Sequence, residues 1–356
     1  MSGGVDSSVA AAMLVQEGYD VIGVTMQIWP ATSAPEAAFS RACCSLSAVE
    51  DARRVAASLG IPHYVMNFKD VFETTVIDNF IEEYRRGRTP NPCARCNRFV
   101  KFDALLDRAR GLGAEYVATG HYSRIVHDET RDRWLLRRGL DGSKDQSYAL
   151  YSMTQDQLAH TLMPLGGMAK DETRRLAADL GLAVAAKPDS QDICFVENRD
   201  YPGFLKAHAP ETARSGPILD MAGSVIGEHD GIAFYTVGQR RRIGIAVGEP
   251  LYVVRIDPAR SAIIVGRNED LLSTDLAASD LNFISIVKPA KPIAVTAKVR
   301  YNMKDSPALL VPLEGNRIRV SFEKPQRAIA PGQAVVFYQG DDVAGGGTIE
   351  EVNSNQ

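Results

Sequence analysis

The sequence predicts an α/β fold: a doubly wound parallel sheet, followed by a small central domain and a C-terminal β-barrel. Three observations support this prediction. Strand-like apolar runs alternate with helical patterns in the first third of the 356 residues, glycine-punctuated mixed segments occupy residues 202–265, and short alternating runs follow residue 280. We therefore expect three domains, at residues 1–200, 201–275 and 276–356.

The elements of the first domain follow from apolar spacing and from the glycines that end helices. An Ala-rich run at 9–14 predicts a helix that ends near Gly18, and helical spacing over 47–59 predicts a second helix that stops at Gly60. Strands are expected at 21–26, 63–68 and 116–119, and further helices at 70–86 and 99–111. In the last domain, strands are expected at 293–300, 317–322 and 334–338.

Composition limits the class of protein. The chain is 45% hydrophobic and 24% charged, as is usual for soluble globular proteins. It has no apolar run of membrane-spanning length and no signal-peptide pattern, so we expect a cytoplasmic protein with no membrane partner. The formal net charge of −4 argues only weakly against a nucleic-acid partner, because local basic patches can still bind phosphates.

The strongest motif is the heptad Ser2-Gly3-Gly4-Val5-Asp6-Ser7-Ser8 at the start of the chain. Adjacent glycines allow a tight turn, serine hydroxyls add donors, and the helix that follows offers its positive end to an anion. A Gly-Ser turn before a helix is the alternative for a lone glycine pair, but the whole heptad favours a phosphate site. Met26 and Gly120-His121 also follow predicted strands, so all three pieces are expected in one crevice.

The five cysteines show no secretory disulfide pattern. Cys93 and Cys96 lie in Gly87-Arg-Thr-Pro-Asn-Pro-Cys-Ala-Arg-Cys-Asn97, and we place Cys96 near a helix N-terminus, beside cationic side chains that favour a thiolate. A structural zinc half-site, which Cys43-Cys44 would complete with poor spacing, is the alternative for this pair. Cys194 is interpreted either as a buried small residue or, from the polar run before it, as a residue on an exposed loop.

Together the motifs resemble one family in order and over essentially the whole chain. The heptad resembles the PP-loop of ATP pyrophosphatases, which have an adenine nucleotide alpha hydrolase-like fold. The other matching segments are GRTPNPCARCN, Ala118-Thr-Gly-His-Tyr122, Lys144-Asp-Gln-Ser-Tyr148, DSQDICF, Gly238-Gln239-Arg240 and Pro331-Gly332-Gln333. This set resembles bacterial tRNA-uridine 2-sulfurtransferases, whereas other PP-loop families share only the loop. A buried strand precedes the loop in PP-loop enzymes, so we expect that the start of the chain has been placed too late.

The resemblance implies ATP- and Mg²⁺-dependent 2-thiolation of the wobble uridine (position 34) of tRNA through an O2-adenylated base. Cys194 would carry a persulfide and Cys96 would attack or resolve it, with a disulfide between them. ATP would contact Ser2, Gly3, Gly4, Val5, Asp6, Ser7, Met26 and Gly120, and the target base would contact Asn91, Pro92 and Cys93. The residues implied in tRNA contacts are His121, Lys144, Asp145, Gln146, Arg300, Tyr301 and Gln333.

One departure leaves the sulfur chemistry open. Many family members carry Asp where this chain has Cys93, and Cys93, Cys96 and Cys194 could instead hold a [4Fe–4S] cluster that binds sulfide on its open iron. The expected partners are tRNAs for Glu, Gln and Lys and a sulfur donor, such as a cysteine desulfurase or a persulfide relay protein, acting on a monomer. Arg240-Arg241-Arg242 is a predicted phosphate contact, with a solvated basic face as its alternative.

The two rival functions are a PP-loop enzyme that amidates a small molecule with ammonia and a non-catalytic RNA-binding or iron–sulfur scaffold. Neither the cysteine pair Cys43-Cys44 nor the remaining histidines are assigned a role. These histidines are His63, His127, His160, His208 and His229.

Overall fold

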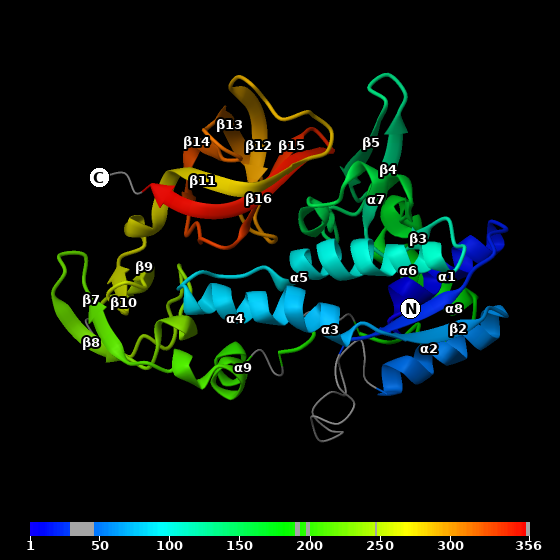
Figure 1. The fold of residues 1–356 in the computed structure, drawn as a ribbon, viewed down its shortest axis with the longest axis horizontal. Coiled ribbons are helices and arrows are strands. Elements are labelled where there is room, and N and C mark those ends of the chain that lie inside the picture. Colours follow the sequence, from blue (N-terminus) through cyan, green and yellow to red (C-terminus); the bar gives the residue numbers. More distant parts are fainter. Residues whose placement is uncertain (29–45, 189–192, 197–199, 246–247, 354–356) are drawn as a thin grey trace. The chain divides into compact units, whose positions relative to one another are not determined.

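The computed structural model describes residues 1–28, 46–188, 193–196, 200–245 and 248–353 (Figure 1). The chain divides into two compact units. The first comprises Met1–Val76, Cys93–Arg199 and Asp341–Val343, and the second comprises Ile77–Pro92, Asp200–Gly340 and Ala344–Gln356. No helix among the described residues is both long and apolar enough to cross a membrane.

The first unit contains the predicted alternation of strands and helices. Its elements are α1 (Val5–Gln16), β1 (Gly23–Gln27), α2 (Leu46–Leu59), β2 (His63–Asn67), α3 (Lys69–Phe72), α5 (Pro92–Arg95), the π-helix η2 (Cys96–Ala104), α6 (Leu105–Gly111), β3 (Val117–Ala118), β4 (Ser123–Asp128), β5 (Arg133–Arg138), η3 (Ser147–Leu150), α7 (Gln155–Ala159), β6 (Thr161–Leu162), η4 (Pro164–Gly167) and α8 (Lys170–Asp179). The π-helix η1 (Glu73–Ile77) connects α3 to α4 (Asp78–Arg85).

Parallel strand pairing in this unit confirms the predicted α/β class. β1 pairs in parallel with β2, from Gly23 opposite His63 to Gln27 opposite Asn67, and β3 pairs in parallel with β6. The α1 helix is buried along most of its length, because Val9, Ala10 and their neighbours pack against Tyr122, α8 and η4. Small side chains on α1 allow this close packing, so the Ala-rich run marks a core helix.

The helix that carries Cys96 begins earlier than predicted. The sequence placed it at residues 99–111, but helical structure begins at Pro92, with α5, η2 and α6 following one another to Gly111. A proline suits the first helical position, since its φ is already helical and its missing N–H costs no hydrogen bond there. Cys93 therefore lies in the first turn, and Cys96 opens the π-helical segment rather than standing at the helix N-terminus.

The β4–β5 hairpin was not predicted. Its strands pair from Ser123 opposite Arg138 to Asp128 opposite Arg133, and the Asp128 carboxylate accepts hydrogen bonds from the backbone N–H of Thr130 and Arg131 in the turn. Leu135 and Leu136 are both fully buried, so the strand does not show the simple alternation that identifies a half-exposed strand. Its many arginines hide the pattern further.

The second unit contains α4 and two β structures. A four-stranded sheet has the order β8-β7-β10-β9, and a closed barrel of six strands has the order β11-β14-β13-β12-β15-β16, completed by pairing of β11 with β16. The barrel is the closed set of strands in Figure 1, and its interior is filled by apolar side chains such as Leu310, Val320 and Phe337. This barrel confirms the predicted C-terminal fold.

The other helical segments of the second unit are short, namely α9 (Tyr201–His208), η6 (Pro210–Thr212), η7 (Ile232–Phe234) and η8 (Glu269–Leu271). Strands are β7 (Gly216–Leu219), β8 (Val225–His229), β9 (Tyr252–Asp257), β10 (Ala262–Gly266), β11 (Leu272–Phe283), β12 (Ile293–Lys298), β13 (Ser306–Pro312), β14 (Ile318–Arg327), β15 (Ala334–Gln339) and β16 (Asp342–Asn353).

Two buried histidines are held in their neutral form. Burial lowers the pKa of His229, whose Nε2–H donates to the Ser261 carbonyl at 3.0 Å while Nδ1 accepts from the Gly231 N–H at 3.0 Å. Burial, with a smaller contribution from the charge of Lys101, places the pKa of His121 well below its ordinary value. Protonating either ring in the folded state is therefore unfavourable.

We expect the free energy of unfolding to fall as the pH is lowered from 7 to 5. A histidine whose folded pKa is lowered binds more protons when unfolded, so its contribution is complete above about pH 6.5 and declines below it. His229→Gln should show a shallower fall in melting temperature over this range than the wild type. The exposed His208→Gln is the matched control, and identical pH profiles for the wild type and both variants would contradict the assignment.

Candidate active site

The glycine loop is shaped by a close backbone approach. Gly3 has φ +67°, and a Cβ at this position would overlap the Ala48 carbonyl, at 2.8 Å from its carbon. Gly4 is the N-cap of α1 in an extended conformation, and the hydroxyls of Ser7 and Ser8 donate to its carbonyl at 3.3 and 2.9 Å. The turn therefore needs glycine at position 3, whereas position 4 has ordinary backbone geometry.

The loop leads directly into α1, which begins at Val5 inside the motif. Because Gly4 has no side chain, it cannot cap the first-turn N–H groups of the helix. The Ser7 hydroxyl binds back to the loop, accepting from the Ser2 N–H at 3.0 Å and lying 3.1 Å from the Ser2 hydroxyl. The arrangement combines a helix N-terminus, glycines and hydroxyls, which is the usual combination for binding phosphate.

Asp6 in this loop is held by Lys170, which the sequence analysis did not identify, and by Tyr122. The buried Lys170, at the start of α8, donates to both carboxylate oxygens of Asp6 at 2.7 and 2.8 Å. The Tyr122 hydroxyl also donates to Asp6 at 2.8 Å and lies 3.0 Å from the Thr173 hydroxyl. A lysine on an amphipathic helix resembles a surface charge in sequence, so only the fold reveals this pairing.

A second lysine supports the loop from the other direction. Lys187 Nζ donates to the Gly3 carbonyl at 2.9 Å and to Asp51 of α2 at 2.8 Å. The backbone carbonyl of Lys187 accepts from Arg174 of α8 at 3.0 Å. The glycine loop is thus tied to both α2 and α8, and we expect this to limit its motion.

Gly120, which follows β3, lies against Asp6 and Ser7 of the loop, as expected for residues at the ends of parallel strands. A Cβ on Gly120 would lie 2.6 Å from the Asp6 carbonyl carbon and 2.8 Å from the Ser7 nitrogen, so only glycine fits. The next residue, His121, is buried, and its Nδ1 lies 2.7 Å from the Thr119 hydroxyl. Met26 lies near the end of β1, opposite Met66 of β2.

The described cysteines differ in exposure. Cys93 is exposed, and Cys96 and Cys194 are half-buried. The guanidinium of Arg95, next to Cys96, lies 4.5 Å from the Phe99 ring centroid, and that of Arg98 lies 4.9 Å from it. Cys194 precedes the buried Phe195, whose ring packs edge-on against Phe72 at 5.7 Å. The polar residues 189–192 before Cys194, and also Cys43 and Cys44, lie outside the described residues.

The possible iron–sulfur cluster does not fit this arrangement. Among the described residues, which include Cys93, Cys96 and Cys194, no three His, Cys, Asp or Glu side chains are grouped so that they could hold a metal ion. A cluster with one open iron needs three gathered thiolates, and Cys93, Cys96 and Cys194 do not form such a group here. The zinc alternative also involves Cys43 and Cys44, which lie outside the described residues.

Several residues implied in tRNA contacts have structural partners in the first unit. The buried Asp145 carboxylate accepts from the N–H groups of Gly139 and Ser147 and from the Ser147 hydroxyl, at 2.9–3.1 Å. The Gln146 Oε1 accepts from the Tyr122 N–H at 3.0 Å, whereas Lys144 is only half-buried. Asp145 and Gln146 therefore stabilise the loop around Tyr122, and their tRNA contacts stay a prediction.

The predicted tRNA contacts in the second unit fall into two kinds. Tyr301 is 41% exposed, so its ring is accessible for stacking. Arg300 donates instead to the carbonyls of Val237 and Ala328, and Gln333 donates to the carbonyls of Thr89 and Pro90. The set that the resemblance implied thus contains one exposed aromatic ring, Tyr301, and two side chains, Arg300 and Gln333, that bind backbone carbonyls of the protein.

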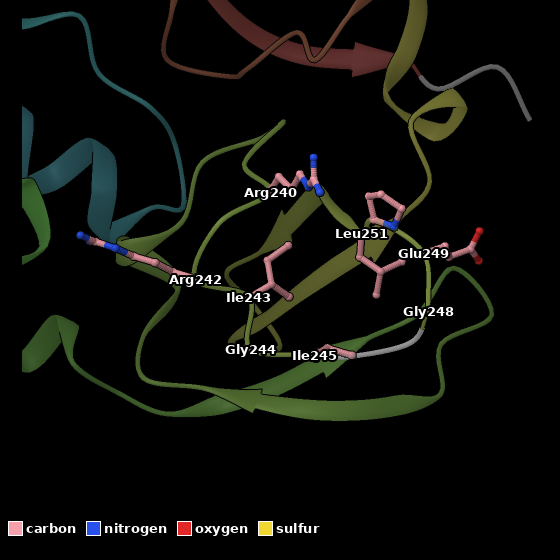
Figure 2. Close-up of a pocket in the computed structure, with 9 residues that line it drawn as sticks. Arg240, Arg242, Ile243, Gly244, Ile245, Gly248, Glu249 and Leu251 are labelled. Atoms are coloured by element: carbon pink, nitrogen blue, oxygen red, sulfur yellow. The ribbon is translucent and has the colours of Figure 1, made fainter.

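Arg240, Arg241 and Arg242 are all exposed. Arg240 and Arg242 line a shallow hollow of about 380 Å³, and their side chains extend in different directions in Figure 2. Arg242 has φ +68°, and its carbonyl accepts from the Tyr235 hydroxyl at 3.3 Å. Because all three side chains are exposed, this solvent-facing turn can contact phosphates directly.

Three family models of related description match successive parts of the chain and together cover most of it. Residues 1–198 match the family model described as the tRNA methyl transferase HUP domain, 202–267 match the tRNA methyl transferase PRC-barrel domain, and 273–349 match the aminomethyltransferase beta-barrel domain. The tRNA-specific 2-thiouridylase MnmA of Acetivibrio thermocellus is 53% identical over 98% of both chains. Proteins of the same name from Pelotomaculum thermopropionicum and Heliobacterium modesticaldum are 55% and 56% identical over 98% of this chain and 96% and 91% of theirs.

These relatives match the chain almost from end to end, and the glycine loop of α1 has the geometry of a phosphate site. The chain therefore belongs to the tRNA-specific 2-thiouridylase (MnmA) family of sulfurtransferase enzymes.

Proposed function

We propose that this enzyme transfers sulfur to C2 of the wobble uridine of tRNA after ATP has activated the base. The observation that carries the proposal is the close packing of the loop before α1. The backbone of Gly3 lies against Ala48 and that of Gly120 lies against Asp6 and Ser7, at distances that leave no room for a side chain. That loop suits the phosphates of ATP, and the full-length family membership favours tRNA as the second substrate. Ser2, Gly3, Gly4, Val5, Asp6 and Ser7 are the proposed phosphate contacts, with Met26 and Gly120 beside them.

In the first step, O2 of the uridine attacks the α-phosphate of ATP and pyrophosphate leaves, so the base becomes O-adenylated. The α1 N-terminus and loop amides stabilise the charge on the transferring phosphate. Magnesium bound with ATP would neutralise the phosphate oxygens, and Asp6, whose side chain is 35% exposed, is the loop carboxylate that could face it. Lys170 holds Asp6 in one orientation.

In the second step, we propose that Cys194 carries a persulfide. Its terminal sulfur attacks C2, the C2–O bond breaks and AMP leaves. The Cys96 thiolate then attacks Sγ of Cys194, which breaks the S–S bond to the base and releases 2-thiouridine. The resulting Cys96–Cys194 disulfide is reduced by an external dithiol. A sulfur donor such as a cysteine desulfurase or a persulfide relay protein then transfers sulfur to Cys194 again. We further propose that the enzyme is cytoplasmic and acts as a monomer.

The direct test uses an unmodified transcript of a glutamate tRNA. The transcript is incubated anaerobically with enzyme, ATP, Mg²⁺, a dithiol and either sulfide or a cysteine desulfurase with cysteine, and its nucleosides are analysed by mass spectrometry. We expect 2-thiouridine only when ATP is present. If the tRNA binds but no donor yields 2-thiouridine, the proposal is rejected, and ATP consumption with ammonia would favour an amidating enzyme.

The arginine turn supplies a separate prediction. Arg241→Ala with Arg242→Ala should weaken tRNA binding and lower the slope of log affinity against log salt by about 1.5, because each phosphate contact contributes about 0.7–0.9. The matched control is Arg255→Ala with Arg260→Ala, two exposed arginines of the same unit. Equal slopes for the two double variants, measured by filter binding from low to moderate salt, would remove Arg241 and Arg242 from the interface.

A further inference from the structure

The segment between α4 and α5 has no regular secondary structure, yet its polar groups are bonded to other parts of the second unit. The Arg88 N–H donates to the Glu83 carbonyl at 2.8 Å, at the end of α4. The Thr89 N–H donates to the Pro331 carbonyl at 2.8 Å, in the turn before β15. This segment runs directly into Asn91 and Pro92, which with Cys93 form the proposed target-base contact.

Gln333 makes the most specific contact with this segment. Its amide Nε2 donates to the Thr89 carbonyl at 3.0 Å and to the Pro90 carbonyl at 2.8 Å. The Pro90 carbonyl stands just before α5, outside regular secondary structure, and the side chain of Gln333 satisfies it. Both hydrogens that the amide nitrogen can donate have protein acceptors.

The turn that carries Gln333 fits closely against the segment. Gly332 has φ +88°, and a Cβ there would lie 2.9 Å from the Thr89 carbonyl oxygen and 3.0 Å from its nitrogen. The turn is fixed to the barrel in return, since Gly332 N–H donates to the Ile349 carbonyl and Ile349 N–H donates to the Gln333 carbonyl, both at 2.8 Å. The barrel backbone thus provides a rigid support for residues 89 and 90.

Arg88 adds a partly buried ion-pair network at the same place. Its guanidinium donates to Glu83 at 2.7 Å and to both carboxylate oxygens of Glu350 on β16, at 2.5 and 3.2 Å. The hydrogen bond from Arg88 lowers the pKa of Glu350, which also accepts from Ser279 at 2.6 Å. The Arg88 side chain is only 18% exposed, so this is a stronger contact than an ordinary surface pair.

We propose that Gln333, supported by Arg88, is a positioning residue that holds Thr89 and Pro90 against the barrel and so sets the position of the target-base residues that follow. The inference rests on the proposed function, because it assigns that role to Asn91, Pro92 and Cys93. The tRNA contact that the resemblance implied for Gln333 stays a prediction beside this role. Loss of the clamp should lower turnover even when tRNA is saturating, because the target-base residues would no longer be held in one position.

The test compares Gln333→Glu and Gln333→Met with Gln339→Glu. Neither Gln333 variant can donate to the two carbonyls, and both keep the length of the side chain. Gln339, exposed at the end of β15, is a matched control for the added charge. We expect both Gln333 variants to lower kcat for thiolation at saturating tRNA at least tenfold, and Gln339→Glu to match wild type. A smaller fall in kcat at saturating tRNA in both Gln333 variants, with any loss of activity restored by adding more tRNA, would overturn the proposal.

Hydrogen–deuterium exchange gives a readout that does not depend on activity. The Thr89 N–H is protected by its hydrogen bond to the Pro331 carbonyl, and this bond should open more often when Gln333 no longer holds the segment. Peptides spanning residues 86–92 should therefore exchange faster than wild type in both Gln333 variants and at the wild-type rate in Gln339→Glu. Unchanged exchange in the Gln333 variants would overturn the clamp. If the Gln333 variants exchange faster but the wild-type enzyme forms no 2-thiouridine, the clamp is upheld and the proposed function is rejected.

Discussion

Cys96→Ser and Cys194→Ser are each expected to reduce 2-thiouridine formation to the level seen without enzyme. A serine hydroxyl can neither carry a persulfide nor attack one, so either change removes a bond that the proposed sulfur transfer must form or break. Both cysteines are half-buried, and serine is close to cysteine in size, so the fold should be retained. Nucleoside mass spectrometry measures the activity, and melting temperature with tRNA binding measures the fold.

Cys93→Ser separates the two sulfur routes that the sequence left open. In the persulfide route Cys93 neither carries nor resolves sulfur, so its serine variant should keep at least about a tenth of wild-type activity. In a cluster route all three cysteines are ligands, and Cys93→Ser would be as inactive as the other two variants. The exposed position of Cys93 and the lack of a grouped metal site among the described residues favour the first result.

Gly3→Ala is expected to lower the free energy of unfolding by about 3 kcal/mol and to abolish ATP binding. The residue has φ +67°, where a side chain is strained, and a Cβ would overlap the Ala48 backbone. The loop can accept the methyl group only by moving away from α2, which displaces the proposed phosphate contacts. Chemical denaturation and calorimetry with ATP measure the two effects.

Gly4→Ala is the matched control for this prediction. Gly4 has an extended backbone, and a Cβ there would make only an ordinary contact, 3.5 Å from the Ser2 hydroxyl. Its stability should lie within about 1 kcal/mol of wild type, whatever happens to ATP binding. Equal destabilisation by Gly3→Ala and Gly4→Ala would show that the Ala48 contact does not shape the loop.

Much of the candidate site could be predicted because its signals are local. The glycine pair Gly3-Gly4 stands just before an Ala-rich helix, and Gly120 stands just after a short strand. Glycines at such places indicate tight turns and close backbone approaches of the kind that bind phosphate. The approach of Gly120 to Asp6 followed from the rule that ligands bind where parallel strands end. The helix start at Pro92 was missed because the strong apolar spacing begins only after Cys96.

The supporting residues could not be predicted, because a polar side chain does not reveal its partner in the sequence. Lys170 and Lys187 look like ordinary charges on or near a helix, yet they bind Asp6 and the Gly3 carbonyl. Asp145 looks like part of a polar loop available to RNA, yet its carboxylate is buried on three donors. Such pairings depend on residues more than a hundred positions apart or on loop geometry, which periodicity does not encode.

The sequence alone determined the α/β class, the C-terminal barrel, the glycine loop and the family, because each depends on short motifs or on apolar periodicity. The tertiary structure alone decided which polar groups hold the loop in place. It also decided that Gln333 binds the carbonyls of Thr89 and Pro90, since a glutamine donates to whatever acceptor the folded chain brings within 3 Å. Local conformation is a property of neighbouring residues, whereas hydrogen-bond partners are chosen by the whole fold.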